Sequence, residues 1–188
     1  MFKVISKEDF NISIQEIRDF LRIDDEYQDD ILLSMFNSVM IYAEEYTGIT
    51  LTKTVYKAYK NNWCDNFYIY ATPVDSIDSI KYYDINNVLQ TQTDFNVTYE
   101  IYPYVYSLNN PPPLMNKPQP IEITFTAGSS RCPTDLRTAL KMHTLSLFEN
   151  RGDDASITFI PANALVVYNK YKIVNIGGLP QKGFHYYV

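Results

Sequence analysis

The chain has 188 residues, of which 46% are hydrophobic and 20% are charged, and its formal net charge is −6. This length is sufficient for one core of ordinary size, and this composition is typical of a globular protein. The negative charge argues against a protein that grips nucleic acid through its phosphates, and no segment approaches the roughly 20 apolar residues of a membrane-spanning helix.

The N-terminal segment MFKVISKEDF lacks the apolar stretch of a signal peptide, which predicts a chain that stays in the cytoplasm after synthesis. Cys64 and Cys132 are far apart and have no CxxC spacing. Free thiols are therefore the main expectation, with a disulfide or a metal-binding pair as the alternative.

A short first helix is predicted from Ser13 to Leu21. Ser13 and Glu16 have the spacing of a capping box, in which each residue satisfies a backbone N–H of the other. Apolar residues then recur on one helix face. The acidic segment IDDEYQDD follows and separates this helix from the next.

A longer second helix is predicted from about Asp29 to Thr47, because apolar residues keep the helical period for four turns. Its first residues are acidic, which suits the positive end of the helix dipole, and Gly48 fits a left-handed C-cap. Glu44 and Glu45 lie in the last turn, where the dipole disfavours acids. These two glutamates therefore need an explanation other than helix stability.

Short strands are predicted between residues 52 and 127, where runs rich in Val, Ile, Tyr, Phe and Thr alternate with Asn, Asp and Pro clusters. This spacing favours a small antiparallel sandwich or barrel. The segment DINNVL indicates a hairpin turn in which Asn86 and Asn87 tolerate positive φ. The segment NNPPPLMNKPQP, residues 109–120, predicts an exposed loop.

Helical signals return near residue 131. Pro133 fits the first helical position, and one face of the helix is then marked by Leu136, Ala139, Leu140, His143, Leu147 and Arg151. Gly152 is expected to end this helix. The segment FIPANALVVYNKY predicts a short last helix with Pro161 near its start, and a tail follows.

The predicted fold class is therefore α+β. A small helical bundle is built from the N- and C-terminal helices, and an antiparallel β-sandwich-like domain is inserted into it. The predicted boundaries are residues 1–51 for the first helices, 52–130 for the β domain, 131–174 for the last helices and 175–188 for a flexible attachment tail.

No motif commits the chain to catalysis or to a cofactor. Residues 24–30 are acidic but lack the alternation and the central glycine of a calcium loop. His143 lies on an apolar helix face, which favours a packing role over a catalytic one, and no partner motif supports catalysis by it. The aromatic strands favour a core over a stacking platform for nucleic acid, since the chain is acidic. We therefore expect no catalytic residue, no metal and no cofactor.

The order of five segments carries a resemblance: FLRIDDEYQDD, YAEEYTGITL, VDSIDSIKYYD, ITFTAG and CPTDLRTALKMHTLSLFENRGD. Together they resemble the head–tail connector, or adaptor, family of tailed double-stranded-DNA bacteriophages, related prophages and gene transfer agents. The resemblance covers about residues 13–155.

This resemblance implies a structural protein and not an enzyme. It implies a dodecameric ring of neighbouring adaptor subunits beneath the portal protein, in the neck of a virion assembled in the host cytoplasm. Such a ring extends the channel through which double-stranded DNA passes without specific binding, and it offers a docking surface to stopper or tail-completion proteins. No membrane is involved. The alternatives are another neck component, such as a stopper or tail-completion protein, and a soluble β-sandwich binding module; a hydrolase is a more distant one.

Three groups of residues are candidates for these contacts. Glu44 and Glu45 either line the channel or a subunit boundary, where acid repels DNA phosphates, or are two solvated surface acids. Arginines are expected to meet acids of the next subunit, and the candidates are Arg131, Arg137 and Arg151.

The C-terminal tail is the third candidate, because Gly177 and Gly178 supply freedom and apolar residues follow. It either attaches to the portal or to a neighbouring subunit, or packs on its own domain. The attachment residues are Leu179, Phe184, His185, Tyr186, Tyr187 and Val188.

Overall fold

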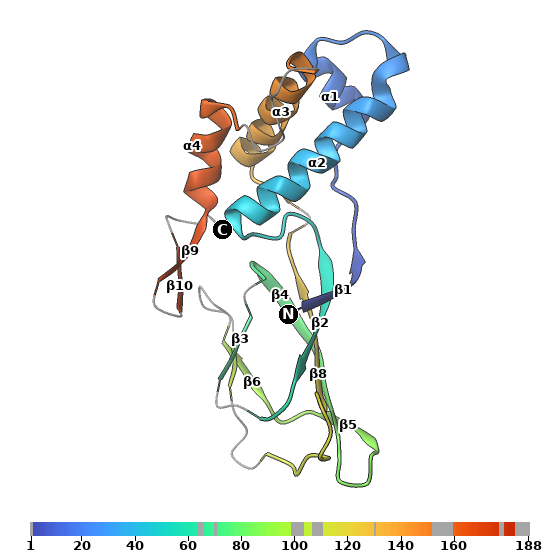
Figure 1. Ribbon diagram of the computed structural model, residues 1–188, viewed down its shortest axis with the longest axis vertical. Helices are drawn as coiled ribbons and strands as arrows, with labels where there is room; N and C mark the ends of the chain where they lie inside the picture. The colour runs from blue at the N-terminus through green and yellow to red at the C-terminus, as the bar shows by residue number, and fades with distance from the viewer. Residues whose placement is uncertain are drawn as a thin grey trace. The chain divides into compact units, whose positions relative to one another are not determined.

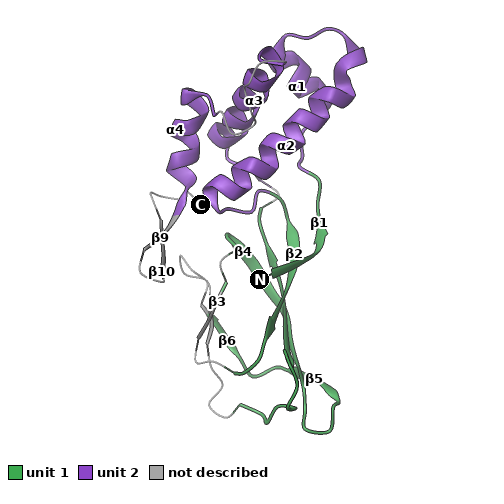
Figure 2. Ribbon diagram, viewed as in Figure 1, with its two compact units in different colours: residues 1–9, 52–129 green, residues 10–51, 130–188 purple. Residues whose placement is uncertain are grey.

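The computed structural model describes residues 2–63, 66–69, 71–98, 104–106, 111–129, 131–151, 160–176 and 179–182. The chain forms two compact units (Figure 2). Residues 1–9 and 52–129 make up one, called here the β unit, and residues 10–51 and 130–188 make up the other, called the helical unit. The α+β fold class predicted from the sequence is confirmed.

The helical unit combines the two ends of the sequence (Figure 1). Its elements are α1 (Ile14–Leu21), the 3-10 turn η1 (Glu26–Gln28), α2 (Asp29–Thr47), α3 (Thr134–Glu149), α4 (Ala162–Tyr171), β9 (Ile173–Ile176) and β10 (Leu179–Lys182). Helix α3 packs against α2 and α4, and α1 packs against α2 and α3. The predicted bundle of N- and C-terminal helices is therefore present.

One apolar core holds these helices together. Each helix contributes buried side chains to it, among them Ile17, Leu32, Phe36, Val39, Leu136, Leu140, Ala164 and Tyr168. Phe36 and Leu136 come from opposite ends of the sequence and belong to the same core. Burial of a large apolar side chain contributes about 1.5–3 kcal/mol, so this shared core stabilises the pairing of distant segments.

The local signals for the helix ends are largely correct. Ser13 Oγ accepts a hydrogen bond from the Glu16 N–H, 3.1 Å away, and α1 begins there. Gly48 ends α2 with φ of 74°, as a left-handed cap requires. Pro133 lies just before α3 and not at its first helical position, and α3 ends at Glu149, so that Arg151 lies beyond the helix.

The β unit contains a five-stranded antiparallel sheet with the order β1-β2-β8-β4-β5. Its strands are β1 (Phe2–Lys7), β2 (Thr54–Lys60), β4 (Val74–Tyr83), β5 (Leu89–Gln92) and β8 (Ile121–Ala127). A three-stranded sheet has the order β3-β7-β6 and consists of β3 (Asn66–Tyr68), β6 (Asn96–Thr98) and β7 (Tyr104–Tyr106). Whether the two sheets form the predicted sandwich stays a prediction.

Among the described residues, the core of the β unit has fewer buried hydrophobic side chains than that of the helical unit. Ile80, Ile121, Ile123 and Phe125 are its large buried residues on the central strands, and Phe125 is fully buried. Their side chains alternate along β8, as expected for a strand with one face in a core. Two neighbouring strands, β2 and β4, pair with β8 along its whole length.

Strand β1 differs from the sequence prediction, which assigned all of residues 1–51 to the helical part. Residues 2–7 instead pair with β2 at the edge of the five-stranded sheet. Most side chains of β1 are exposed, and its register shifts between Val4 and Ser6. An edge strand that buries so little has no clear period of two, which is why the sequence pattern missed it.

The C-terminal segment also differs from the prediction of a flexible tail from residue 175. Residues 173–176 and 179–182 pair as the antiparallel strands β9 and β10, with Ile176 opposite Leu179. Leu179 therefore belongs to a hairpin. Gly177, Gly178 and residues 183–188 lie outside the described residues.

The predicted turn after β4 is present, with a left-handed residue at one of the two predicted positions. Asn87 has φ of 60°, whereas Asn86 does not take a positive φ. The Asp84 carboxylate accepts the backbone N–H groups of Asn86 and Val88 at 2.9 and 3.0 Å. The turn is thus fixed by one aspartate and one left-handed asparagine, which is how short polar residues organise turns.

The proline-rich loop is ordered against the sheet over residues 111–120. The Trp63 Nε1–H donates to the Pro112 carbonyl at 2.8 Å. The Met115 N–H donates to the Tyr83 carbonyl at 3.0 Å, and the Tyr83 N–H donates to the Pro120 carbonyl at 2.9 Å. The loop therefore extends the hydrogen bonding of β4 beyond β8.

Candidate functional site

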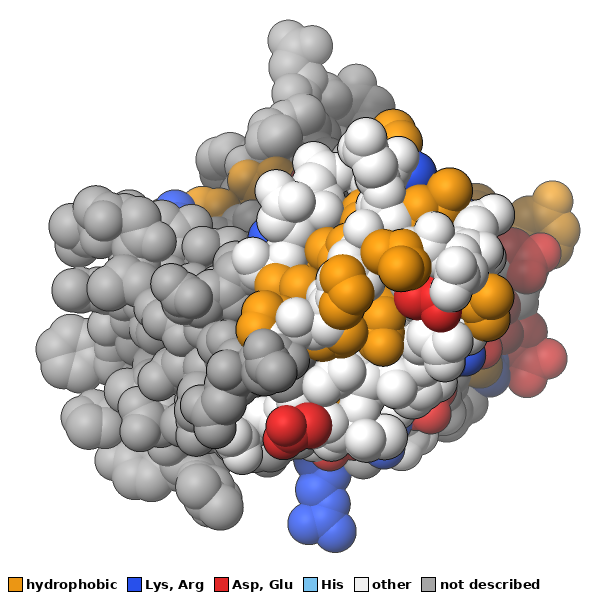
Figure 3. Space-filling view, turned by 90° about the horizontal axis from the view of Figure 1, so that it is seen from below, with side chains coloured by type: hydrophobic (Ala, Val, Ile, Leu, Met, Phe, Trp, Pro, Cys, Tyr) orange, Lys and Arg blue, Asp and Glu red, His pale blue; other side chains and the backbone are white. Residues whose placement is uncertain are grey.

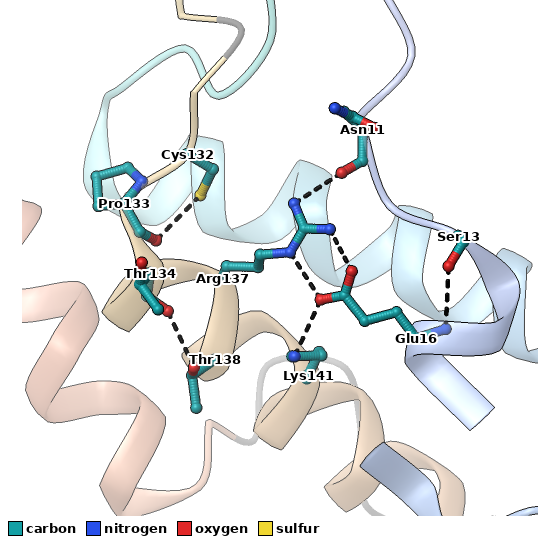
Figure 4. A network of polar contacts seen from close by, with 9 residues as sticks. All are labelled: Asn11, Ser13, Glu16, Cys132, Pro133, Thr134, Arg137, Thr138 and Lys141. Atoms are coloured by element: carbon teal, nitrogen blue, oxygen red, sulfur yellow. Dashed lines mark hydrogen bonds and ion pairs between the residues drawn. The ribbon is translucent and has the colours of Figure 1, made fainter. Parts of the chain in front are cut away.

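A polar network of the helical unit centres on Arg137 in α3 (Figure 4). Its Nε donates to Glu16 Oε1 at 2.7 Å, and a second guanidinium nitrogen bonds the other oxygen of the same carboxylate. Its third nitrogen donates to the Asn11 carbonyl at 2.7 Å. One helical turn further on, the Lys141 ammonium bonds Glu16 Oε1 at 3.0 Å. Two cations of α3 thus hold one carboxylate of α1.

This arrangement changes the acid strength of Glu16. The hydrogen bond from Arg137, together with the one from Lys141, lowers the pKa of Glu16 from 4.5 to about 2, although partial burial opposes the shift. Paired guanidinium–carboxylate hydrogen bonds are among the stronger polar contacts in proteins. The network therefore ties α1 to α3, and Glu16 acts between helices and not in the reciprocal capping box that the sequence predicts.

Arg137 was predicted to contact a neighbouring subunit, and the structure gives it three hydrogen bonds within its own chain. Arg151 is exposed: its Nε donates to the Phe148 carbonyl and another nitrogen to Gln28 Oε1, both at 3.1 Å. Arg131 is exposed as well and precedes α3. The contacts of all three with a second subunit stay predictions.

The two glutamates at the end of α2 have different environments. Glu44 is half-buried, and its Oε1 accepts the Leu51 N–H at 2.9 Å. It therefore holds the chain where it leaves α2, and this hydrogen bond offsets the unfavourable helix dipole. Glu45 is exposed. Of the two, Glu45 alone is exposed, and the channel or subunit contacts expected of both residues stay predictions.

A second polar cluster joins α3 to α4. Asp135 accepts hydrogen bonds from the Lys170 ammonium at 2.7 Å and from the Tyr171 hydroxyl at 2.6 Å. Partial burial raises the pKa of Asp135, but the hydrogen bonds from Lys170 and Tyr171 outweigh it and lower that pKa. This cluster, like the one at Arg137, stabilises the bundle.

His143 is fully buried among aromatic rings, as predicted for a packing residue. Its Nδ1 lies 3.4 Å from the Tyr168 hydroxyl, and Tyr42 meets its ring edge-on. Of the other histidine, His185, and of the attachment residues Phe184, Tyr186, Tyr187 and Val188, the structure describes nothing, since all lie outside the described residues.

The acidic segment before α2 forms local contacts. Asp25 Oδ1 accepts the Tyr27 N–H at 2.9 Å, and Arg18 lies 3.4 Å from Glu26 and 3.5 Å from Asp29. Within the described ranges, no group of three or more His, Cys, Asp or Glu side chains is placed to hold a metal ion. In the same part of the chain, no helix is both long and apolar enough to cross a membrane.

The structure is that of a two-unit α+β protein whose polar clusters join helices and fix turns. The family model of phage gp6-like head-tail connector proteins matches residues 11–110 of the chain. The chain belongs to the phage gp6-like head-tail connector family.

Solved structures agree with this fold. The chain is similar to a chain in the neck of an empty gene transfer agent particle (TM-score 0.76) and to one in the neck of a native particle with C12 symmetry (TM-score 0.74). It is also similar to a chain of the native gene transfer agent virion, with a TM-score of 0.77. Each match has 21% identity and covers 95% of this chain and 98% of the other. No curated protein matches the sequence.

The sequence analysis did not predict two features of the structure. The partner of Glu16 lies in α3, and a capping-box pattern gives no sign of so distant a contact. The turn DINNVL exposes apolar side chains beside its asparagines. Ile85 and Val88 flank the two turn residues directly, so the signal was present in the sequence.

Proposed function

We propose that the chain is a subunit of a dodecameric ring in the neck of a virion or virus-like particle, between the portal and the tail. The observation that carries this proposal is the fold similarity over 95% of the chain to subunits of gene transfer agent necks, one of them with C12 symmetry. Family membership supports the same role, since it rests on residues 11–110 of the sequence itself.

The ring extends the DNA channel below the portal. DNA passes through it without specific binding, which agrees with a net charge of −6 and with the exposed position of Glu45. Acids that line a channel repel phosphates, and they lower the friction on a sliding duplex. A structural role of this kind needs no catalytic residue.

Subunit contacts in the ring use two unlike patches on every subunit, because each subunit meets its two neighbours through different surfaces. Arg131 and Arg151 are exposed and meet acids of the next subunit. Arg137 also contributes to these contacts, because a guanidinium has five N–H groups and three of them are used within the chain. Such contacts at the rim set register and association rate more than affinity.

The last residues of the chain form the attachment segment. Hairpin β9–β10 leads to residues 183–188, whose Phe184, Tyr186, Tyr187 and Val188 supply apolar area for a portal groove. Repetition around a ring turns a weak contact into a durable one through effective concentration.

Deletion of the gene in the producing phage or prophage tests the function. We expect DNA-filled heads that carry no tails, with free tails in the same lysate, and full recovery when the intact gene is supplied. Tailed particles in the deletion strain would overturn the proposal. Heads that already hold the protein but lack later neck proteins would place it next to the portal, whereas tails that carry it before joining would identify a tail-completion protein.

Truncation after Lys182 tests the attachment segment separately. We expect the truncated chain to keep its helical circular dichroism and its melting temperature while it no longer binds tailless heads. A truncated chain that joins heads as well as the full chain does would assign residues 183–188 to packing on their own unit.

A further inference from the structure

The outward face of α2 carries large apolar side chains and no charge over three turns. Ile31 is 44% exposed, Leu33 37% and Ile41 52%, and residues 31–43 contain no charged side chain. On the face of the molecule seen in Figure 3, by contrast, acidic side chains lie beside hydrophobic ones, as is usual for a protein surface. A helix that is apolar around most of its circumference is normally buried on more than one side.

Helix α4 has a second exposed face with an apolar centre. Val166 is 72% exposed, and the exposed residues Asn163 and Lys170 lie about one turn to either side of it. Lys170 is the one charged residue of α4. Its ammonium donates to Asp135 at 2.7 Å within the chain, but the side chain is 42% exposed and an ammonium has three donors, so it can also bond a second carboxylate.

The charges at the ends of these two faces are opposite. Helix α2 has Asp29 and Asp30 at its start, Glu44 and Glu45 near its end, and no basic residue. Two α2 faces in contact would bring acids together, which disfavours a symmetric pair. The face of α4, with a base and no acid, complements that of α2, and such complementarity selects the partner and sets its register.

The spacing of the exposed side chains matches when the two helices run antiparallel. The three matched pairs are Asp30 with Lys170, Ser34 with Val166 and Asn37 with Asn163. On each helix the three positions are separated by four and then three residues, which keeps them on one face. In this register a lysine meets an aspartate, a branched apolar side chain fits over a small serine, and two amides can exchange hydrogen bonds.

We propose that the outward face of α2 packs against α4 of a neighbouring copy of this chain, antiparallel and in this register. The inference rests on the ring proposed above and identifies the two unlike patches that the ring needs. The partner is a second copy because both faces belong to this chain and complement each other in charge, spacing and side-chain size. Glu45 lies at the other end of α2 from Asp30 and takes no part in this contact.

The test is disulfide trapping in assembled particles. The double variant Ser34→Cys/Val166→Cys, with Cys64→Ser and Cys132→Ser in the background, replaces the wild-type chain in the producing phage or prophage. After oxidation we expect a ladder of disulfide-linked multimers on a denaturing gel, because a disulfide requires Cβ atoms about 3.5–4.5 Å apart. Glu45→Cys/Val166→Cys in the same background is the matched control, and it should give monomers.

Val166→Asp measures the same contact without introduced cysteines. Because Val166 is exposed, the isolated variant should keep its circular dichroism and melting temperature, whereas the yield of tailed particles should fall at least about tenfold. Val166→Ile should retain the yield. Val4→Asp is the matched control, because Val4 is 52% exposed but belongs to the β unit, and it should assemble as the wild type does.

Two results would overturn the inference. One is a set of tailed particles in which Ser34→Cys/Val166→Cys gives only monomers or no more multimers than the control pair. The other is a folded Val166→Asp chain that assembles as well as the wild type, and this measurement decides if the cysteine variants do not assemble. Tailed particles in the strain that lacks the gene would instead refute the proposed function, so the two failures are distinguishable.

Discussion

The two units differ in what one well-connected polar side chain of each holds together. In the helical unit, Arg137 and Asp135 join helices that come from different parts of the sequence. In the β unit, Asp84 fixes a turn whose neighbours Ile85 and Val88 remain exposed. Arg137 links segments that are distant in the sequence, whereas Asp84 fixes a local turn beside exposed apolar side chains. Other polar contacts of the β unit, such as that between Lys57 and Glu122, join neighbouring strands.

The difference extends to the cores. Phe36 of the helical unit and Phe125 of the β unit are each at most 1% exposed, and they lie in separate clusters. Strand β1 belongs to the β unit although α1 follows it directly in the sequence. The chain therefore crosses between the units more than once, and the two cores share no residue.

Removal of a core phenylalanine should have the largest effect and should test the independence of the cores. Phe36→Ala is expected to destabilise the helical unit by about 3–5 kcal/mol, because it removes a large buried side chain and leaves a cavity. Urea unfolding followed by ellipticity at 222 nm reports mainly on the helices. Trp63, the only tryptophan, reports on the β unit through its fluorescence.

Phe125→Ala is the matched variant in the other core and is expected to shift mainly the Trp63 transition. If either variant shifts both transitions by the same amount, the units unfold as one cooperative body and the comparison fails. If each shifts its own probe, the two cores are separate in energy as well as in space.

The network at Arg137 should give the next largest effect. Arg137→Met keeps the length of the side chain but leaves the partly buried Glu16 carboxylate with Lys141 alone, which is expected to cost about 1–3 kcal/mol in the 222 nm transition. Arg151→Met is the control, because Arg151 is exposed and surface substitutions usually stay within about 0.5 kcal/mol. Equal effects of the two variants would contradict a special role for the network.

The same network predicts a pH dependence. Because the pKa of Glu16 is about 2 in the folded chain and 4.5 in its ordinary state, the unfolded chain binds the proton first as the pH falls. The stabilisation is fully present above about pH 4.5 and is lost as the pH falls towards 2. We expect Glu16 to account for about 1–2 kcal/mol of this loss, since solvent screens the pair. Arg137→Met should reduce this loss of stability. If the unfolding free energy of the variant falls between pH 4.5 and 2 as steeply as that of the wild type, the loss does not come from Glu16.

The sequence predicts those features that depend on neighbouring residues. The ends of α2 were found because its apolar period, Asp29 and Gly48 all lie within one segment. The turn at Asn87 was found for the same reason. The contact of Glu16 with Arg137 joins positions far apart in the sequence, and no local pattern specifies it. Strand β1 was not predicted, because its mostly exposed side chains show no alternation of buried and exposed residues.

A local effect is expected at the hairpin. The hydrogen bond from the Val88 N–H, together with those from Gln90 and Asn86, lowers the pKa of Asp84. Asp84→Ala removes these acceptors, so amide hydrogen exchange at Asn86 and Val88 should accelerate at least tenfold while the Trp63 transition stays in place. The wild type should show the same loss of protection, relative to the intrinsic exchange rate at each pH, only when the pH falls through the lowered pKa of Asp84. Unchanged exchange in the variant would show that the turn is fixed by the backbone alone.

The smallest expected effect concerns the thiol beside the Arg137 network, and it leaves stability unchanged. Burial raises the pKa of Cys132 to about 12, although Arg137 acts in the opposite direction. The thiolate is the reactive form, so at pH 8 alkylation of Cys132 by iodoacetamide should be roughly 10³-fold slower than that of a free cysteine.

The measurement uses a Cys64→Ser background, so that one thiol is followed by mass spectrometry, with a urea-unfolded sample as the reference. Arg137→Met should slow the reaction further if the guanidinium acts by charge, or accelerate it if the arginine acts by covering the sulfur. A folded chain that reacts at the rate of the unfolded reference would show that the half-buried Cys132 is accessible after all, and that the packing around the start of α3 is looser than the rest of the helical unit.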